Sequence, residues 1–123
     1  PVPGILESPF GVFESKIFSY KKQKIEEKKY TKWFDYDKIK NSPCVRTRRQ
    51  GDYLTVNSEG GRKKLNRIFI DEKIPAEMRD RLPVVAVGSE ILWIPGGRMN
   101  EKYKITSTTG RVLELHYQGG ALA

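Results

Sequence analysis

Apolar and polar side chains alternate along much of the chain, which predicts a protein built mainly from β-strands. Residues 10–20 combine aromatic and β-branched side chains with a period of two, and the same period returns at 30–36, 44–49 and 53–56. Residues 84–87 and 90–94 flank a Gly-Ser turn and predict a tight, buried hairpin. A last hairpin is expected from 102–106 and 111–117.

The period changes in the middle of the chain. Leu65, Ile68 and Phe69 are spaced i, i+3 and i+4, which predicts a short helix beginning just past the glycines at 60–61. The first turn of this helix would hold three cations, Arg62, Lys63 and Lys64. Pro75 suits the first turn of a second short helix over 75–81. Strands, two short helices and strands again predict an α+β domain with mainly antiparallel sheet.

Length and local composition suggest how the chain is divided. The 123 residues fit one domain, which we expect at 10–117. Residues 1–9 are rich in Pro and Gly and resemble the end of a linker from an absent upstream region. Residues 118–123 have nothing to hold them and should fray. Residues 21–29 are strongly charged and predict a solvated loop.

Charge and cysteine content narrow the possible partners. The net charge of +8 and the pI near 9.7 favour anionic partners. Purely structural basic proteins share this balance, so charge alone does not establish nucleic-acid binding. A single cysteine excludes an intrachain disulfide. The sequence shows no signal-peptide pattern, and no apolar run approaches the roughly 18 residues of a membrane span.

A search for catalytic chemistry finds no site. Metal sites need clustered His, Cys or carboxylate side chains, and this chain has only His116 and Cys44 of the first two types. Cys44 is expected to be a small, half-buried strand residue and His116 an ordinary surface or edge residue. Neither a phosphate-binding Gly-x-x-x-x-Gly-Lys-Ser/Thr loop nor a Gly-x-Ser-x-Gly turn is present. We therefore expect no catalytic residue, metal or cofactor in this stretch of chain.

Positive charge concentrates between residues 45 and 75. Two cation clusters lie next to glycine turns, and guanidinium forks with close backbone N–H groups suit a phosphate-rich partner. With two flanking cations they form the predicted binding set: Arg46, Arg48, Arg49, Arg62, Lys63, Lys64, Arg67, Lys73 and Arg98. We expect Arg46 and Arg48 to project from the same strand face. The alternative is a salt bridge from Arg46 or Arg48 to Asp52.

The two tryptophans have two possible roles. Trp33 and Trp93 could be stacking platforms for unpaired bases, but each lies in an apolar strand pattern, which favours core packing.

Four motifs resemble one known family. They occur in the order and spacing of the C-terminal domain of bacterial tRNA(Ile)-lysidine synthetases, and the similarity covers about residues 30–117. Two departures, Gln50 and the second glycine of the last motif, affect turn geometry rather than charge. The motifs are Val45-Arg-Thr-Arg-Arg-Gln-Gly-Asp52, Phe69-Ile-Asp-Glu-Lys-Ile-Pro75, Arg79-Asp-Arg-Leu-Pro-Val-Val85 and Trp93-Ile-Pro-Gly-Gly-Arg98.

The resemblance implies a fold and a role. The fold would be a β-sandwich of unusual topology with helices packed alongside, similar to a module of the phenylalanyl-tRNA synthetase β-subunit. The family's enzymes use ATP and Mg²⁺ in an N-terminal catalytic domain to convert the wobble cytidine of minor isoleucine tRNA to lysidine in the cytoplasm. The Ser-Gly-Gly-x-Asp-Ser loop of that domain is absent here. This chain would be a non-catalytic module that grips tRNA towards the acceptor stem. The alternative is a basic protein-interaction or structural module without specific RNA binding.

Overall fold

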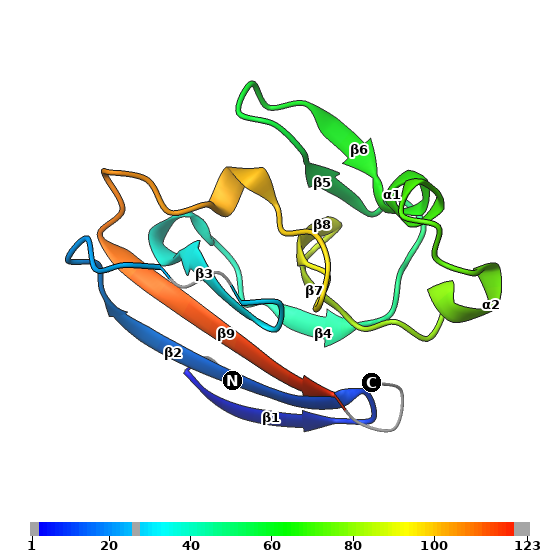
Figure 1. The fold of residues 1–123 in the computed structure, drawn as a ribbon, viewed down its shortest axis with the longest axis horizontal. Helices are drawn as coiled ribbons and strands as arrows, with labels where there is room; N and C mark the ends of the chain where they lie inside the picture. Colours follow the sequence, from blue (N-terminus) through cyan, green and yellow to red (C-terminus); the bar gives the residue numbers. More distant parts are fainter. Residues whose placement is uncertain (1–2, 26–27, 120–123) are drawn as a thin grey trace. The chain divides into compact units, whose positions relative to one another are not determined.

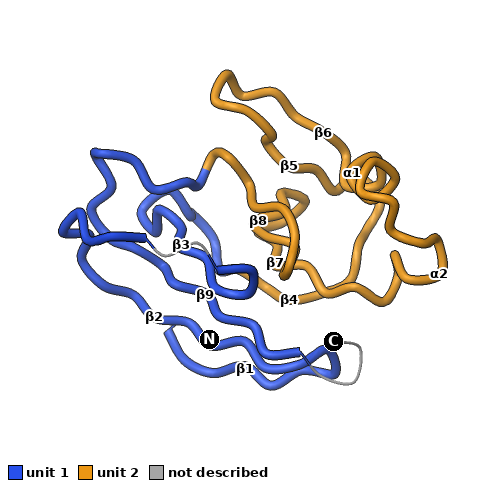
Figure 2. The backbone as a smooth tube through the Cα atoms, viewed as in Figure 1, with its two compact units in different colours: residues 1–42, 103–123 blue, residues 43–102 orange. Residues whose placement is uncertain are grey.

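The computed structural model describes residues 3–25 and 28–119 (Figure 1). The chain forms two compact units (Figure 2). Unit 1 combines residues 1–42 with 103–123, and unit 2 comprises residues 43–102. The unit 1 strands come from both ends of the sequence, whereas unit 2 is one continuous segment.

Unit 1 is built on a four-stranded antiparallel sheet. Its strands lie in the order β1 (Gly4–Ser8), β2 (Gly11–Ser19), β9 (Arg111–Gly119) and β3 (Thr31–Asp35). The period of two in the sequence is real, because on β2 Phe13 and Ser15 are buried while Glu14 between them is exposed. Two single-turn 3₁₀ helices, at Tyr36–Lys38 and Glu101–Tyr103, follow β3 and precede β9.

Unit 2 is built on a five-stranded mixed sheet and two short helices. The strand order is β4 (Cys44–Arg46), β7 (Val84–Val87), β8 (Glu90–Trp93), β5 (Tyr53–Thr55) and β6 (Arg62–Lys64), and only β5 and β8 pair in parallel. Helices α1 (Leu65–Asp71) and α2 (Ala76–Arg79) follow β6. The apolar stripe of α1 joins β5, β7 and β8 in the core cluster of Leu54, Leu65, Ile68, Phe69, Val84, Ala86, Ile91 and Ile94.

Several sequence predictions are confirmed. The fold is α+β with mainly antiparallel sheet and two short helices. The β7–β8 hairpin lies where the Gly88-Ser89 turn placed it, and Trp93 is fully buried. The strands at 10–20, 30–36 and 53–56 are present with slightly shorter bounds.

The predicted start of the first helix is wrong. Arg62–Lys64 form an edge strand whose Lys63 pairs with Leu54, and the helix begins only at Leu65. Lys64 caps the helix with extended backbone (φ −67°, ψ 142°), and the Leu65 N–H donates to the Asp52 carbonyl at 2.9 Å. The three cations therefore lie on a strand. Cross-strand pairing with β5 decides their conformation, which local spacing could not reveal.

The predicted last hairpin is also wrong. Residues 104–110 contain no strand, since the Thr109 hydroxyl accepts the Thr106 N–H at 2.8 Å and folds the segment into a loop. Strand β9 instead pairs with β2 and β3, far away in sequence. The third predicted strand ends at Arg46 rather than at residue 49.

The two ends of the chain contribute strands. Residues 4–8 pair with β2 as β1, and Gln118 and Gly119 belong to β9, so these residues of the predicted linker and tail have partners. Residues 120–123 lie outside the described residues. A linker origin for 1–9 and a single domain at 10–117 stay predictions.

Candidate nucleic-acid interface

Arg46 is a buried structural residue. Its Nη1 and Nη2 donate to Asp52 Oδ2 and Oδ1 at 2.8 and 2.9 Å, and Nη2 also donates to the Gly88 carbonyl at 2.7 Å. Only 9% of Arg46 is exposed. The hydrogen-bonded Asp52 carboxylate raises the pKa of Arg46 further above its usual value. The alternative, a salt bridge from Arg46 to Asp52, is confirmed, and the expectation that Arg46 presents its charge on the surface is wrong.

Arg48 and Arg49 follow Arg46 without continuing its strand. Arg48 Nε donates to Asp80 Oδ1 at 2.7 Å and its Nη1 to Asn66 Oδ1 at 2.8 Å, which ties it to α1 and the end of α2. The hydrogen bond from Arg48 to Asp80 lowers the pKa of Asp80. Arg46 and Arg48 do not share a strand face, because β4 has already ended. The Arg49 side chain is exposed at the turn that leads to β5.

The second basic cluster encloses one carboxylate. Lys63 on β6 forms a salt bridge with Asp71 at the end of α1, and Arg67 Nε lies 3.3 Å from Asp71 Oδ1. The hydrogen bond from Lys63 is the main cause of the lowered pKa of Asp71, and the charges of Lys63, Arg67 and Arg98 lower it further. Several cations thus meet around one anion, which leaves an excess of positive charge.

Arg62 and Lys64 occupy the other side of the same strand. The Arg62 guanidinium lies 4.6 Å from the centre of the Tyr53 ring, a cation–π contact, and Lys64 is the register partner of Tyr53. Both side chains are exposed. We call Arg62, Lys63, Lys64 and Arg67 the β6–α1 cluster. Strand β6 is the last strand of the sheet, so the cations of the cluster lie along an open sheet edge.

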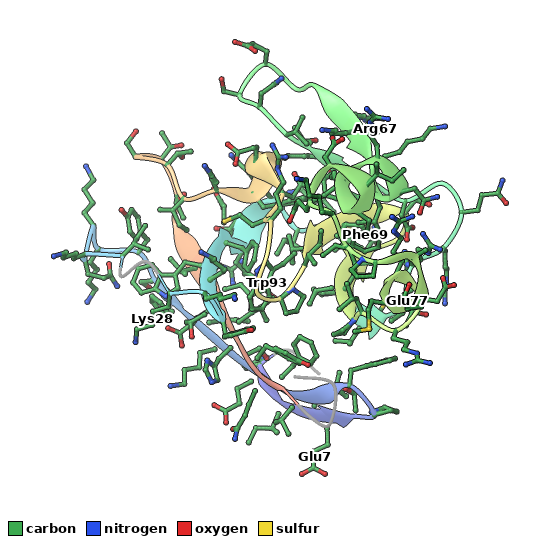
Figure 3. All side chains as sticks on the ribbon, turned by 45° about the vertical axis from the view of Figure 1, so that its right-hand side comes forward. Glu7, Lys28, Arg67, Phe69, Glu77 and Trp93 are labelled. Atoms are coloured by element: carbon green, nitrogen blue, oxygen red, sulfur yellow. The ribbon has the colours of Figure 1, made fainter. Side chains whose placement is uncertain are left out.

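The remaining two predicted contacts are less closely tied to this cluster. Lys73 is exposed just past α1, where its positive φ of 58° turns the chain. Arg98 is half-buried, and its Nη2 donates to the Val56 carbonyl at 3.4 Å. Figure 3 labels Arg67, which is exposed, and Phe69, which the same helix buries in the core.

The part of the chain that contains this basic segment matches a known family. The model of the TilS substrate C-terminal domain matches residues 44–115, more than half of the chain. The chain belongs to the TilS substrate C-terminal domain family.

Relatives of this TilS C-terminal domain agree with that match. A tRNA(Ile)-lysidine synthase of Caldanaerobacter subterraneus subsp. tengcongensis is 50% identical over 88 residues, which are 72% of this chain and 19% of the relative. A tRNA(Ile)-lysidine synthase of Clostridium perfringens is 38% identical over 110 residues, 89% of this chain and 23% of the relative. The chain therefore spans about a fifth of the length of these curated relatives.

A solved structure extends the similarity to the whole fold. The crystal structure of a TilS C-terminal domain is similar with a TM-score of 0.78 and 33% sequence identity, and the match covers 97% of this chain and 92% of that one. The expected family resemblance is thereby confirmed. The matched region includes both units, not only the basic segment.

The described residues of the TilS domain contain no cluster of potential metal ligands. Among them, no three His, Cys, Asp or Glu side chains gather closely enough to hold a metal. His116 Nδ1 is hydrogen-bonded to the Thr31 hydroxyl at 2.7 Å. Cys44 is exposed, which corrects the expectation that it is half-buried. None of the helices in the described part is long and apolar enough to cross a membrane.

Sequence reasoning missed most of the residues that hold the cations; Asp71 was expected to pair with a nearby cation, and that pairing is confirmed. Asp71 pairs with Lys63 and Arg67. Arg48 is hydrogen-bonded to Asp80 and Asn66, and the Arg62 guanidinium stacks on the Tyr53 ring. Only the Arg67–Asp71 pair left a signal in the sequence, since residues four apart lie on one helix face. The other partners come from different elements, and only the folded chain brings them together.

Proposed function

We propose that this domain contacts tRNA for a tRNA(Ile)-lysidine synthase. In this proposal an N-terminal catalytic domain of the parent enzyme uses ATP and Mg²⁺ to convert the wobble cytidine of minor isoleucine tRNA to lysidine in the cytoplasm. The present domain helps to select that tRNA by binding it on the acceptor-stem side. The observation that supports it is the β6–α1 cluster, whose cations outnumber the single carboxylate between them, in a chain of the TilS family.

The chemistry of the cluster suits an RNA backbone. A-form RNA keeps its base edges in a deep, narrow groove, so proteins meet duplex RNA mainly through phosphates and 2′-hydroxyls. Arg62, Lys64 and Arg67 are exposed cations on one strand and the following helix. Lys63 is held by Asp71 and can exchange that partner for a phosphate. Binding the tRNA body would raise the concentration of the wobble base at a distant catalytic site without new chemistry there.

The nine predicted contacts do not contribute equally to this proposal. Arg46 is excluded, because its guanidinium is buried on Asp52. Arg48 is retained as a weaker candidate, since Asp80 already neutralises it. Besides Arg48, seven cations remain as the main proposed tRNA contacts: Arg49, Arg62, Lys63, Lys64, Arg67, Lys73 and Arg98.

Salt-dependent binding tests the proposal. The affinity falls as salt rises, and each phosphate that a cation neutralises adds about 0.7–0.9 to the magnitude of this negative slope of log K against log salt. Arg62→Ala, Lys64→Ala and Arg67→Ala should each weaken minor isoleucine tRNA binding and reduce the slope magnitude by about 1. Lys21→Ala removes the same charge from an exposed loop of unit 1 and should leave the slope unchanged.

The alternative function makes the opposite prediction. Lysines on edge strands also prevent pairing with other chains, so a protein-interaction or structural module could carry the same charges. That module would show equal slopes for all four variants. Selection is tested separately, by competition between minor isoleucine tRNA and initiator methionine tRNA. Equal binding of both tRNAs would contradict selection by this domain.

A further inference from the structure

Unit 1 contains a shallow pocket beside an accessible tryptophan. The pocket has a volume of about 170 Å³ and is lined by Lys24, Lys28, Thr31, Trp33 and Glu114. It opens next to β3, an edge strand of the four-stranded sheet. Trp33 is half-buried, whereas Trp93 in unit 2 is fully buried. The Trp33 ring is thus left partly open to water, and two lysines line the same pocket.

The Trp33 ring is held in a fixed orientation. Its indole Nε1 donates to Glu114 Oε1 at 3.0 Å, and these two residues are register partners on β3 and β9. On β2, which pairs with the other side of β9, the Phe18 ring meets the indole edge-on, with centroids 5.0 Å apart and planes at 75°. These two contacts fix the ring before any ligand arrives, so a planar ligand would lose little entropy by stacking there.

The side chains of the pocket match the two parts of a nucleotide. An indole face stacks on a base, and lysine ammonium groups attract a phosphate. Lys24 and Lys28 are both exposed at the pocket, and Figure 3 labels Lys28. We propose that this pocket binds one unpaired nucleotide of RNA, with its base on Trp33 and its phosphate at Lys24 and Lys28. The nucleotide must be unpaired, because a duplex keeps its bases stacked on one another.

Glu114 adds a preference among bases. Its carboxylate accepts the Trp33 indole N–H at Oε1, which leaves Oε2 of this lining residue as a second hydrogen-bond acceptor. Cytosine carries an amino group at C4, where uracil carries a carbonyl oxygen. A carboxylate accepts a hydrogen bond from the first and repels the second. Among pyrimidines the pocket should therefore favour cytosine over uracil.

Tryptophan fluorescence tests stacking directly, because the second tryptophan is buried and cannot stack on added RNA. Trp93 is fully buried, so quenching by added RNA reports on Trp33. Short single-stranded oligo-C should quench the wild-type chain, whereas an RNA duplex of equal length should not. In Trp33→Phe, which retains an aromatic ring for folding, the quenching should disappear. Unchanged fluorescence of the wild-type chain at saturating oligo-C would overturn the proposal.

Affinity measurements test each lining residue. Trp33→Ala should weaken oligo-C binding about 5- to 150-fold, the equivalent of one stacked base. Lys24→Ala and Lys28→Ala should lower the salt slope, whereas Lys21→Ala, exposed in the same loop but outside the pocket, should not. If both pocket lysines behave like Lys21, no phosphate binds there and the proposal fails.

The base preference provides a separate chemical test. Oligo-C should bind about 2- to 10-fold more tightly than oligo-U, the range expected for one hydrogen bond. Glu114→Gln keeps an oxygen for the indole and replaces the other acceptor with an NH₂ donor, so the preference should vanish or reverse. An unchanged preference would remove Glu114 from the proposed site. Equal quenching by an acidic peptide would show that the pocket accepts any anion, which also overturns a nucleotide site.

This inference rests on the proposed RNA-binding function, but the two can fail separately. Loss of tRNA binding in the β6–α1 variants together with an inert Trp33 would support the proposed function and overturn the nucleotide pocket. Oligo-C binding through Trp33 together with normal tRNA binding by the β6–α1 variants would support the nucleotide pocket and overturn the β6–α1 cluster as the tRNA contact.

Discussion

The two units carry their positive charge on different side chains. Eight of the nine arginines lie in unit 2, whereas ten of the fourteen lysines lie in unit 1. Three arginines of unit 2 make fixed hydrogen bonds: Arg46 to Asp52, Arg48 to Asp80 and Asn66, and Arg79 to the Ile74 carbonyl at 2.9 Å. A planar guanidinium with five donors suits such fixed contacts, while an ammonium on a flexible stem does not.

This difference shows why charge counts overstate a binding surface. Part of the arginine charge in unit 2 is neutralised inside the unit and stabilises its turns and helices. The charge available to a partner lies on the exposed members of the β6–α1 cluster and on lysines. The following predictions test whether the two units differ as described.

The largest effect is expected from the two tryptophans. Trp93→Ala removes a fully buried side chain from unit 2 and should lower the free energy of unfolding by roughly 3–5 kcal/mol. Trp33→Ala in unit 1 should cost clearly less, because its ring is partly exposed. Denaturant unfolding measures both. Equal losses would mean that Trp33 is as much a core residue as Trp93.

The next effect distinguishes the two neighbouring arginines. Arg46→Ala leaves the Asp52 carboxylate buried without its partner and should cost roughly 3–5 kcal/mol. Arg48→Ala breaks a more exposed pair and should cost at most about 1 kcal/mol. Measured at temperatures where it is folded, Arg46→Ala should retain the wild-type salt slope of tRNA binding. A reduced slope would return Arg46 to the interface.

A smaller effect compares one carboxylate from each unit. Asp71→Asn removes the anion among the cations of the β6–α1 cluster, so tRNA binding should become tighter and the salt slope steeper by about 1. Asp37→Asn in unit 1 makes the same charge change at a carboxylate paired with Arg111 at 2.6 Å and should alter the slope less. Identical responses would show that only net charge matters, not its position.

The smallest effect concerns acid stability. Lys63 at Asp71 and Arg111 at Asp37 hold the pKa of each carboxyl below its ordinary value of 3.8. A lowered folded-state pKa contributes stability that is present above 3.8 and is lost as the pH falls through the folded value. The difference in unfolding free energy between wild type and Asp71→Asn should therefore shrink at the acid end of a pH series. A constant difference would contradict this linkage.

The fold was predictable where a signal is local. The Gly88-Ser89 turn between two apolar runs and the i, i+3, i+4 stripe of α1 predicted the β7–β8 hairpin and one helix. Prediction failed where a distant partner decides the structure. Arg62–Lys64 became a strand because β5 pairs with them, and β9 pairs with β2 rather than with the segment before it. Neither pairing has a sequence signature within its own segment.

The candidate site was predictable as a region but not in detail. Clustering of cations pointed to residues 45–75, and the geometry keeps most of them exposed. Burial of Arg46 could not be predicted, because an Arg46–Asp52 pair could equally lie on the surface. Its third partner, the Gly88 carbonyl, comes from a distant part of the sequence. Trp33 was considered as a stacking platform from the sequence, but its pocket was not foreseen, since Lys24, Lys28 and Glu114 come from two segments far apart in the sequence.

The position of β9 at the C-terminal end of the chain affects the order of folding during synthesis. Strand β2 pairs with β9 along its whole length, with Glu14 opposite His116, so unit 1 needs residues from both sides of unit 2. The ribosome releases residues 43–102 before β9 exists, and unit 2 then already has all of its strands. Until β9 emerges, the β1–β2 hairpin lacks a third strand and is marginally stable alone. Until then its unpaired edge is open to pairing with other chains.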